Sequence, residues 1–170
     1  SWAARLTRRI DEIARLIAEE TGKPISDATL EASLAIEQLA WAANNASKVL
    51  GDQKRPSGLL MFNMQAEVHR IPFGVVGVIG PWNYPMFTPM GSIAYALAAG
   101  NTVLLKPSEI AVRSAEVIEK LVNEHFPSEY FHVVNGEGAT VIPALLQNHH
   151  FDHVFFTGST QVGSKIMEMA

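Results

Sequence analysis

PFGVVGVIGPWNYPMFTPMGSIAYALAAGNTVLLKPSE, residues 72–109, is the stretch that decides the fold of this chain. It contains two β-rich runs, Val75–Ile79 and Thr102–Leu105, separated by an apolar segment of helical length. Each run ends abruptly in polar or turn-forming residues, Gly80–Asn83 after the first and Lys106–Glu109 after the second. In doubly wound sheets, ligands bind in the loops beyond the carboxyl ends of parallel strands. The stretch therefore predicts two neighbouring strands with half of a ligand site at their ends.

Predicted strands and helices alternate in the same way through residues 72–170. Short β-branched and aromatic runs alternate with segments of helical periodicity, which is typical of a parallel α/β sheet with right-handed crossovers. The predicted strands are Val75–Ile79, Thr102–Leu105, Phe131–Val134 and His153–Phe156, and the predicted helices are Pro85–Ala99, Val112–Glu124, Ala139–Leu146 and Ser159–Met169.

A layer of two helices is predicted in residues 1–51. Apolar residues recur at helical spacing in Leu6–Ile17 and predict one amphipathic helix, which a Gly-Lys-Pro turn ends. A second, longer helix is expected from a cap at Ser26 or Asp27 as far as Gly51. Its apolar face is expected to include Leu30, Leu34, Ala42 and Ala46.

Residues 52–71 predict a β-hairpin. A turn at Lys54–Gly58 precedes two short extended pieces, Leu59–Phe62 and Ala66–Ile71, which are joined near Asn63. The segment is interpreted as a hairpin of exposed strands.

Composition narrows the class of protein. The 170 residues are 48% hydrophobic and 18% charged, with a formal charge of −4 and a pI near 5.8, which indicates a folded globular chain and gives no reason to expect a nucleic-acid partner. No apolar run approaches the roughly 20 residues of a membrane span, and no secretory leader is recognisable, so we expect a cytoplasmic protein. Cysteine is absent, which excludes disulfides and thiolate chemistry within these residues. The chain opens without Met and stops inside a helical pattern, so both ends are interpreted as internal to a longer protein.

The loop Gly80–Pro85 offers one candidate catalytic side chain. Two prolines stiffen it, and Asn83 presents an amide that can donate to a developing oxyanion. The alternative is that Asn83 caps the following helix, and the loop alone favours this alternative.

The loop after the second strand offers a charged pair. Glu109 can accept both hydroxyls of a ribose, and Lys106 can donate to the same sugar. Taken alone, a solvated surface pair at i,i+3 is the favoured interpretation.

Two glycine-containing turns precede the last two helices. Gly136 and Gly138 match only half of a G-x-G-x-x-G fingerprint, so that pattern fails. Gly158 and Gly163 flank a strand-to-helix turn whose free N–H groups favour an anion, and phosphate binding is preferred there over a simple N-cap by Ser159. Their spacing matches the two glycines of a Walker A loop. That motif requires Lys followed by Ser or Thr, and here the order is Ser followed by Lys.

His149, His150 and His153 have no completing set of metal ligands nearby, so surface histidines are favoured over zinc and no metal is predicted.

Taken together, the motifs resemble those of the aldehyde dehydrogenase superfamily. The residues that carry the resemblance occur in the family's order along essentially the whole chain. They are Glu20–Pro24, Arg70–Val75, Val78–Pro85, Ala98–Glu109 and Phe156–Thr160. The resemblance implies an incomplete aldehyde dehydrogenase fold: a Rossmann-like parallel sheet with helices on both faces, preceded by a helical layer and a β-hairpin of oligomerisation type.

The resemblance also implies roles for individual residues. Asn83 corresponds to the oxyanion donor, Lys106 and Glu109 to contacts of the adenosine ribose, and Ser159 to the pyrophosphate ligand. The implied cofactor is NAD, with NADP possible, and the implied partners are an aldehyde and a second copy of the chain in a homodimer or higher homo-oligomer. The implied cofactor-binding set is Ile79, Gly80, Pro81, Trp82, Lys106, Ser108, Glu109, Gly136, Phe156, Gly158, Ser159 and Gly163.

In the family, a Cys thiolate attacks the aldehyde and a Glu in a Leu-Gly-Gly-Lys-type motif activates water. Both belong beyond Ala170, so these residues alone are expected to be inactive. Two other functions remain open: a truncated, non-catalytic dinucleotide-binding relic, and a P-loop-like nucleotide hydrolase.

Overall fold

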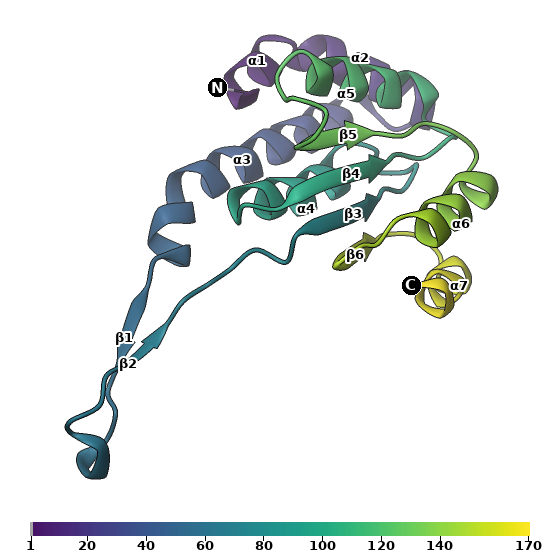
Figure 1. Cartoon of the computed structure of the whole chain (residues 1–170). Helices are drawn as coiled ribbons and strands as arrows, with labels where there is room; N and C mark the ends of the chain where they lie inside the picture. The colour runs from purple at the N-terminus through teal and green to yellow at the C-terminus, as the bar shows by residue number, and fades with distance from the viewer. Residues whose placement is uncertain (1) are drawn as a thin grey trace.

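The computed structural model describes residues 2–170 and contains a four-stranded parallel sheet, a separate two-stranded ribbon and seven helices within that range (Figure 1). The helices are α1 (Trp2–Arg8), α2 (Ile10–Thr21), α3 (Ile25–Leu50), α4 (Phe87–Ala98), α5 (Val112–Asn123), α6 (Gly138–Asn148) and α7 (Thr160–Met169). The strands are β1 (Gln53–Arg55), β2 (Ala66–Val68), β3 (Val75–Ile79), β4 (Thr102–Lys106), β5 (Phe131–Val133) and β6 (His153–Phe156), with a 3₁₀ turn, η1, at Leu59–Met61. None of the helices in residues 2–170 combines the length and the apolarity needed to cross a membrane.

The parallel sheet has the strand order β5-β4-β3-β6, which confirms the predicted Rossmann-like α/β fold. Val76 lies opposite Val103 on one side and His153 on the other, so β3 is paired along both edges. The chain moves outward from β3 to β4 and β5, then crosses back to place β6 beside β3. The order reverses between β3 and β6, and ligands of open α/β sheets bind at such a reversal.

Helices cover both faces of the sheet, as predicted. On one face, buried side chains such as Val78, Leu105 and Phe131 form a core with α4, α5 and the N-terminal helices. On the other face, Leu104 and Val154 approach the apolar side of α6. The central strands β3 and β4 have helices on both faces, which is why they read as nearly continuous apolar runs.

The N-terminal layer differs from the prediction in the number of its helices and in the start of α3. The single predicted helix is broken at Arg9, whose φ of −113° and ψ of 14° separate α1 from α2. Helix α3 begins after Pro24, so the predicted cap at Ser26 or Asp27 is wrong. Proline fixes φ near the helical value and suits the start of a helix, and the N–H groups of Asp27 and Ala28 donate to the Pro24 carbonyl.

The buried face of α3 is a stripe of alanines. Of the predicted apolar face, Ala42 is buried and Leu34 and Ala46 are half-buried, but Leu30 is 58% exposed, so its assignment is wrong. Ala28, Ala32 and Ala35 are buried where α3 packs along α4. Small side chains allow the two helices to approach closely. At Gly91 of α4 an added Cβ would overlap the Gln38 amide of α3.

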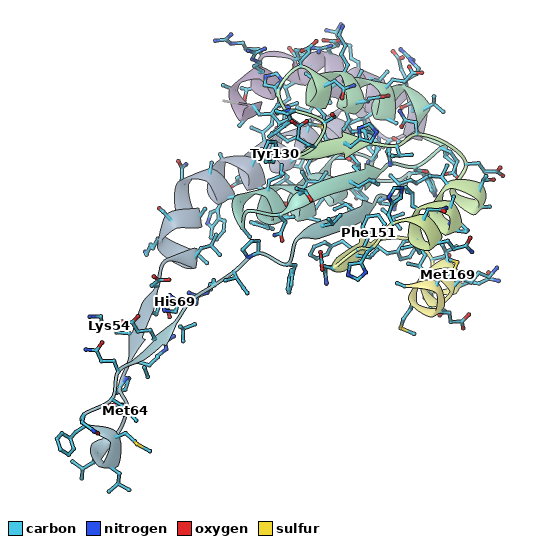
Figure 2. All side chains as sticks on the ribbon, in the orientation of Figure 1. Lys54, Met64, His69, Tyr130, Phe151 and Met169 are labelled. Atoms are coloured by element: carbon cyan, nitrogen blue, oxygen red, sulfur yellow. The ribbon has the colours of Figure 1, made fainter. Side chains whose placement is uncertain are left out.

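The hairpin is present, and its strand β2 lies within the predicted piece Ala66–Ile71, whereas β1 overlaps the predicted turn Lys54–Gly58. Antiparallel pairing joins β1 to β2, with Lys54 opposite Glu67. The predicted extended piece Leu59–Phe62 instead forms the 3₁₀ turn at the tip, where the Met61 N–H donates to the Gly58 carbonyl at 3.2 Å. The hairpin projects away from the sheet, with Lys54 and His69 along its arms and Met64 near its tip (Figure 2). The tip residues have no partner strand, so their backbone N–H and C=O groups form hydrogen bonds within a local turn.

The N-termini of α4 and α5 are capped by carboxylates from the N-terminal layer. Neither helix has a side-chain cap at its own N-cap residue. Glu20 of α2 accepts hydrogen bonds from the Arg113 N–H at 2.6 Å, the Ser114 N–H at 2.7 Å and the Ser114 hydroxyl at 2.6 Å. Glu31 of α3 does the same for Met86 and Phe87. Carboxylates suit helix N-termini because free N–H groups and the helix dipole both favour negative charge there.

We predict that Glu20→Ala lowers the free energy of unfolding by about 2 kcal/mol, because it removes a three-bonded cap. The matched control is Glu19→Ala, since Glu19 makes an exposed ion pair with Arg113 and both side chains are 60% exposed. Exposed pairs contribute about 0–1 kcal/mol. Urea denaturation of both variants decides the matter, and equal midpoints would contradict the capping role.

Candidate functional site

A cleft of about 910 Å³ opens at the carboxyl ends of β3, β4 and β6. Its volume lies in the range of about 300–1,000 Å³ that is usual for small-molecule and cofactor sites. The predicted residues that line it are Ile79, Gly80, Pro81, Trp82, Asn83, Lys106, Ser108, Glu109, Phe156, Gly158 and Ser159. Gly136 and Gly163 belong to the predicted set but do not line this cleft.

The β3–α4 loop forms one wall of the cleft. The start of this loop is still bonded to the neighbouring strand β4, because the Gly80 N–H donates to the Lys106 carbonyl at 3.0 Å. Pro81 is buried, while Trp82 and Asn83 are exposed. The alternative in which Asn83 caps α4 is wrong, because Met86 occupies the N-cap position and Glu31 supplies the carboxylate. The Asn83 side chain makes no hydrogen bond within residues 2–170.

Lys106 and Glu109 form the i,i+3 pair of the surface-pair interpretation at the end of β4, but only Glu109 is exposed, whereas Lys106 is buried. The Lys106 side chain is 3% exposed, and its Nζ lies 2.6 Å from Glu109 Oε2. The other carboxylate oxygen of Glu109 accepts from the Gly138 N–H, at the start of α6, at 3.1 Å. Burial raises the pKa of Glu109, but the hydrogen bonds from Lys106, its own backbone and Gly138 outweigh it and lower the pKa overall. Glu109 is therefore an ionised acceptor that faces the cleft.

Ser159 starts α7 as its N-cap. Its hydroxyl oxygen accepts from the Val162 N–H at 3.3 Å, which confirms the capping alternative. A hydroxyl that accepts one hydrogen bond still has a proton to donate, so capping and anion binding are compatible. The predicted role in phosphate binding stays a prediction.

Gly158 and Gly163 lie against the ring of Phe156. A Cβ on Gly158 would come within 2.5 Å of the ring, and a Cβ on Gly163 within 3.1 Å. The two glycines thus make room for an aromatic ring at the base of the cleft, a role that the sequence did not indicate. Gly136, with a φ of 140°, serves the turn before α6, where an added Cβ would meet Val141 at 2.7 Å.

Sequence reasoning missed the wall that α6 and α7 contribute. These helices lie side by side near the carboxyl ends of the strands (Figure 1). The missed lining residues include Ala139, Ile142, Pro143, Val162, Lys165 and Ile166. Most are apolar, and apolar helix residues carry no chemical signature. The available signal was positional, because both helices follow strands on either side of the sheet's reversal point.

The histidines at positions 149, 150 and 153, for which surface positions were predicted, are exposed at 149 and 150 and half-buried at 153. His153 stacks on Phe73 with ring centroids 5.5 Å apart, and His150 lies 3.4 Å from Asp152. Across residues 2–170, no three His, Cys, Asp or Glu side chains are grouped so as to hold a metal ion.

Comparison with known proteins identifies the family of this arrangement. The family model described as "Aldehyde dehydrogenase family" matches residues 1–170. The N-succinylglutamate 5-semialdehyde dehydrogenase of Pseudomonas fluorescens is 36% identical over 167 residues, which cover 98% of this chain and 33% of that protein. The chain thus spans about a third of the length of the curated relatives it matches.

Solved structures agree with the sequence comparison. An NAD-dependent aldehyde dehydrogenase from Sinorhizobium meliloti superposes with a TM-score of 0.87 at 33% identity, covering 99% of this chain and 33% of that one. An NADP-dependent glyceraldehyde-3-phosphate dehydrogenase from Bacillus halodurans, complexed with NADP, gives 0.87 at 32% identity, covering 100% of this chain and 36% of that one. Similar proteins therefore use either NAD or NADP.

We predict that Gly158→Ala lowers the free energy of unfolding by about 1–3 kcal/mol, because its methyl group would displace the Phe156 ring. Gly163→Ala, with its nearest contact at 3.1 Å, is expected to cost less. Replacing the ring by a smaller side chain, in the double variant Gly158→Ala/Phe156→Leu, should restore part of the lost free energy of unfolding. Thermal denaturation compares the three variants, and an unchanged midpoint for Gly158→Ala would contradict the packing argument.

Proposed function

The chain belongs to the aldehyde dehydrogenase family, and from that premise we propose that it forms the cofactor-binding part of an NAD(P)-dependent enzyme that oxidises an aldehyde to a carboxylic acid. The observation that carries the proposal is the cleft at the reversal of the strand order, lined by loops from three strands. Family membership also removes the nucleotide-hydrolase alternative. The substrate class is proposed from the family and not from any residue of this chain.

The side chains of the cleft fit a dinucleotide. At one end, Lys106 and Glu109 supply a buried ammonium and an ionised carboxylate, which suit the hydroxyls of a ribose. At the start of α7, Ser159 and the helix N-terminus suit a diphosphate. The apolar side of α6 at Ile142 suits a flat base. When bound, NAD(P) supplies the acceptor for the hydride that the aldehyde loses.

Asn83 is proposed as the side chain that stabilises the oxyanion. Its amide is exposed at the cleft and makes no hydrogen bond within residues 2–170, so its N–H donors are available to a substrate oxygen. A side-chain amide that donates to an oxyanion contributes about 3–4 kcal/mol to lowering an activation barrier. The nucleophile that the family uses is a thiol, and this chain contains no cysteine.

The ionised carboxylate of Glu109 favours NAD over NADP, because a 2′-phosphate would meet its negative charge. Similar proteins include an NADP-dependent enzyme solved with NADP, so the preference is proposed as a bias and not as exclusion.

The hairpin of residues 52–71 is proposed as the surface that joins two copies of the chain into a homodimer or higher homo-oligomer. Three tip residues carry the proposal, since Leu59 is 89%, Leu60 93% and Phe62 84% exposed. Apolar side chains clustered on a projecting arm mark an interaction surface. A cytoplasmic location is proposed with it.

Glu109→Gln is predicted to weaken NAD binding roughly tenfold, because a hydrogen bond to a charged group contributes about 1.5–3 kcal/mol. Glutamine keeps the size of the side chain but loses the charge. Glu116→Gln, an exposed position on α5, is the matched control. Isothermal titration with NAD and NADP measures both affinities, and an unchanged affinity for NAD would refute the ribose contact.

Residues 1–170 alone are predicted to reduce no NAD(P) in the presence of aldehyde. Absorbance at the reduced-nicotinamide band over time provides the measurement, with titration of NAD as the check that the protein is folded. Any aldehyde-dependent turnover would contradict the prediction.

The rival function is a non-catalytic dinucleotide-binding relic, which would hold the cofactor in the same cleft. The gene sequence after Ala170 separates the two. A cysteine and a Leu-Gly-Gly-Lys-type Glu there would support the enzyme, and a stop codon would support the relic.

A further inference from the structure

Lys23 and Glu31 form a buried ion pair against the loop that carries Asn83. Lys23 lies in the short connection between α2 and α3, and Glu31 lies on α3. Their side chains are 14% and 0% exposed, and Lys23 Nζ lies 2.5 Å from Glu31 Oε2. A pair this deeply buried is costly to desolvate, so its charges must be compensated by good geometry and further hydrogen bonds.

Both partners make further contacts with the same loop. Lys23 Nζ donates to the carbonyl oxygen of Asn83 at 2.6 Å and lies 4.1 Å from the centre of the Tyr84 ring. Glu31 Oε1 accepts from the N–H groups of Met86 at 3.0 Å and Phe87 at 3.2 Å. One ion pair therefore fixes both the Asn83 backbone and the helix that follows it.

The orientation of the Asn83 amide depends on this support. Since its side chain has no hydrogen bond within residues 2–170, only its backbone is held, and that backbone sets the position of the Cα–Cβ bond from which the amide extends. That backbone is attached to the sheet at Gly80 and to α4 at Met86. Between these two points, the ammonium of Lys23 is the polar group that holds the carbonyl of Asn83.

We propose that Lys23 and Glu31 are positioning residues, which act through Asn83 by holding its amide where a substrate oxyanion develops. The inference rests on the proposed function, because it presumes that Asn83 is the oxyanion donor. A displacement of about 1 Å in a catalytic group can cost about 100-fold in rate. The pair thus gives the N-terminal helical layer a part in the reaction, although neither side chain touches the substrate.

The test variant is Lys23→Met/Glu31→Gln in the full-length protein that carries this chain. Removing both charges together avoids leaving a buried carboxylate unpaired, which would endanger folding. The glutamine introduced in place of Glu31 keeps an oxygen to cap α4, so the variant removes mainly the tie to Asn83. The matched control is Arg9→Met/Glu12→Gln, which neutralises a pair at the start of α2 whose atoms are 2.7 Å apart.

The first readout is the rate of a single turnover at saturating cofactor and aldehyde, measured in a double-mutant cycle with Asn83→Ala. We expect the test variant to lower this rate about 10–100-fold when Asn83 is present, and to have no further effect when it is replaced by alanine. The dissociation constant of NAD should stay unchanged. An equal loss in both backgrounds would show a general structural effect and would overturn the proposal.

The second readout is hydrogen exchange of the peptide that spans residues 80–90, which does not depend on activity. The test variant should speed exchange in this segment, and the control should not. Unchanged exchange overturns the positioning role whatever the protein does. A different outcome concerns the proposed function. If the wild-type protein never reduces NAD(P) with aldehyde, the proposed function is refuted. Faster exchange in the test variant would still show that the ion pair holds the loop.

Discussion

Helix N-termini expose backbone N–H groups that need acceptors, and in this chain two of the sheet's helices obtain them from another layer. Glu31 of α3 caps α4, and Glu20 of α2 caps α5. Neither α4 nor α5 has a capping side chain of its own. The helices that cover one face of the sheet are therefore placed by the N-terminal layer as much as by the strands they follow. The N-terminal layer therefore also helps to orient the loops that follow β3 and β4, since each cap lies where one of these loops enters its helix.

The order of the strands explains where the cleft lies. Helices α4 and α5 return to strands on one side of β3, whereas α6 carries the chain across to β6 on the other side. The loops after β3 and β6 therefore diverge, and the space between them is bounded by α6 and α7. Close backbone hydrogen bonds at Gly80 and Thr157 keep both loops near the sheet as they separate. A cleft at this reversal follows from topology, and the loops determine what it binds.

Sequence reasoning located the strands of the main sheet to within a residue, because buried parallel strands are short apolar runs bounded by turn residues. It failed where the partner of a residue is distant in sequence. The groups that cap α4 and α5 lie 55 and 94 residues from the helices they serve, and no local pattern encodes them. It also failed at the hairpin tip, where Leu59–Met61 satisfies extended-strand preferences but has no strand to pair with. The polar cleft residues of the β3 and β4 loops were predicted through motifs. The wall of α6 and α7, including Lys165, was not, because only its place in the fold distinguishes it.

The interpretations that were favoured one loop at a time failed for a common physical reason. One interpretation made Asn83 the cap of α4, and the other made Lys106 and Glu109 a solvated pair. Both assume that a polar side chain near a turn finds a nearby partner or water. In the folded chain the cap is supplied by Glu31, and Lys106 is 2% exposed. The exposed amide of Asn83 is thus left without a hydrogen bond in residues 2–170, and the hydrogen bonds from Lys106 and Gly138 keep Glu109 an ionised acceptor. Both groups lie on loops joined by the hydrogen bond from Gly80 to Lys106, so a shift in one loop is transmitted to the other. The proposed oxyanion donor and the proposed ribose contacts therefore share one support, and a change that loosens the β3–α4 loop should disturb both.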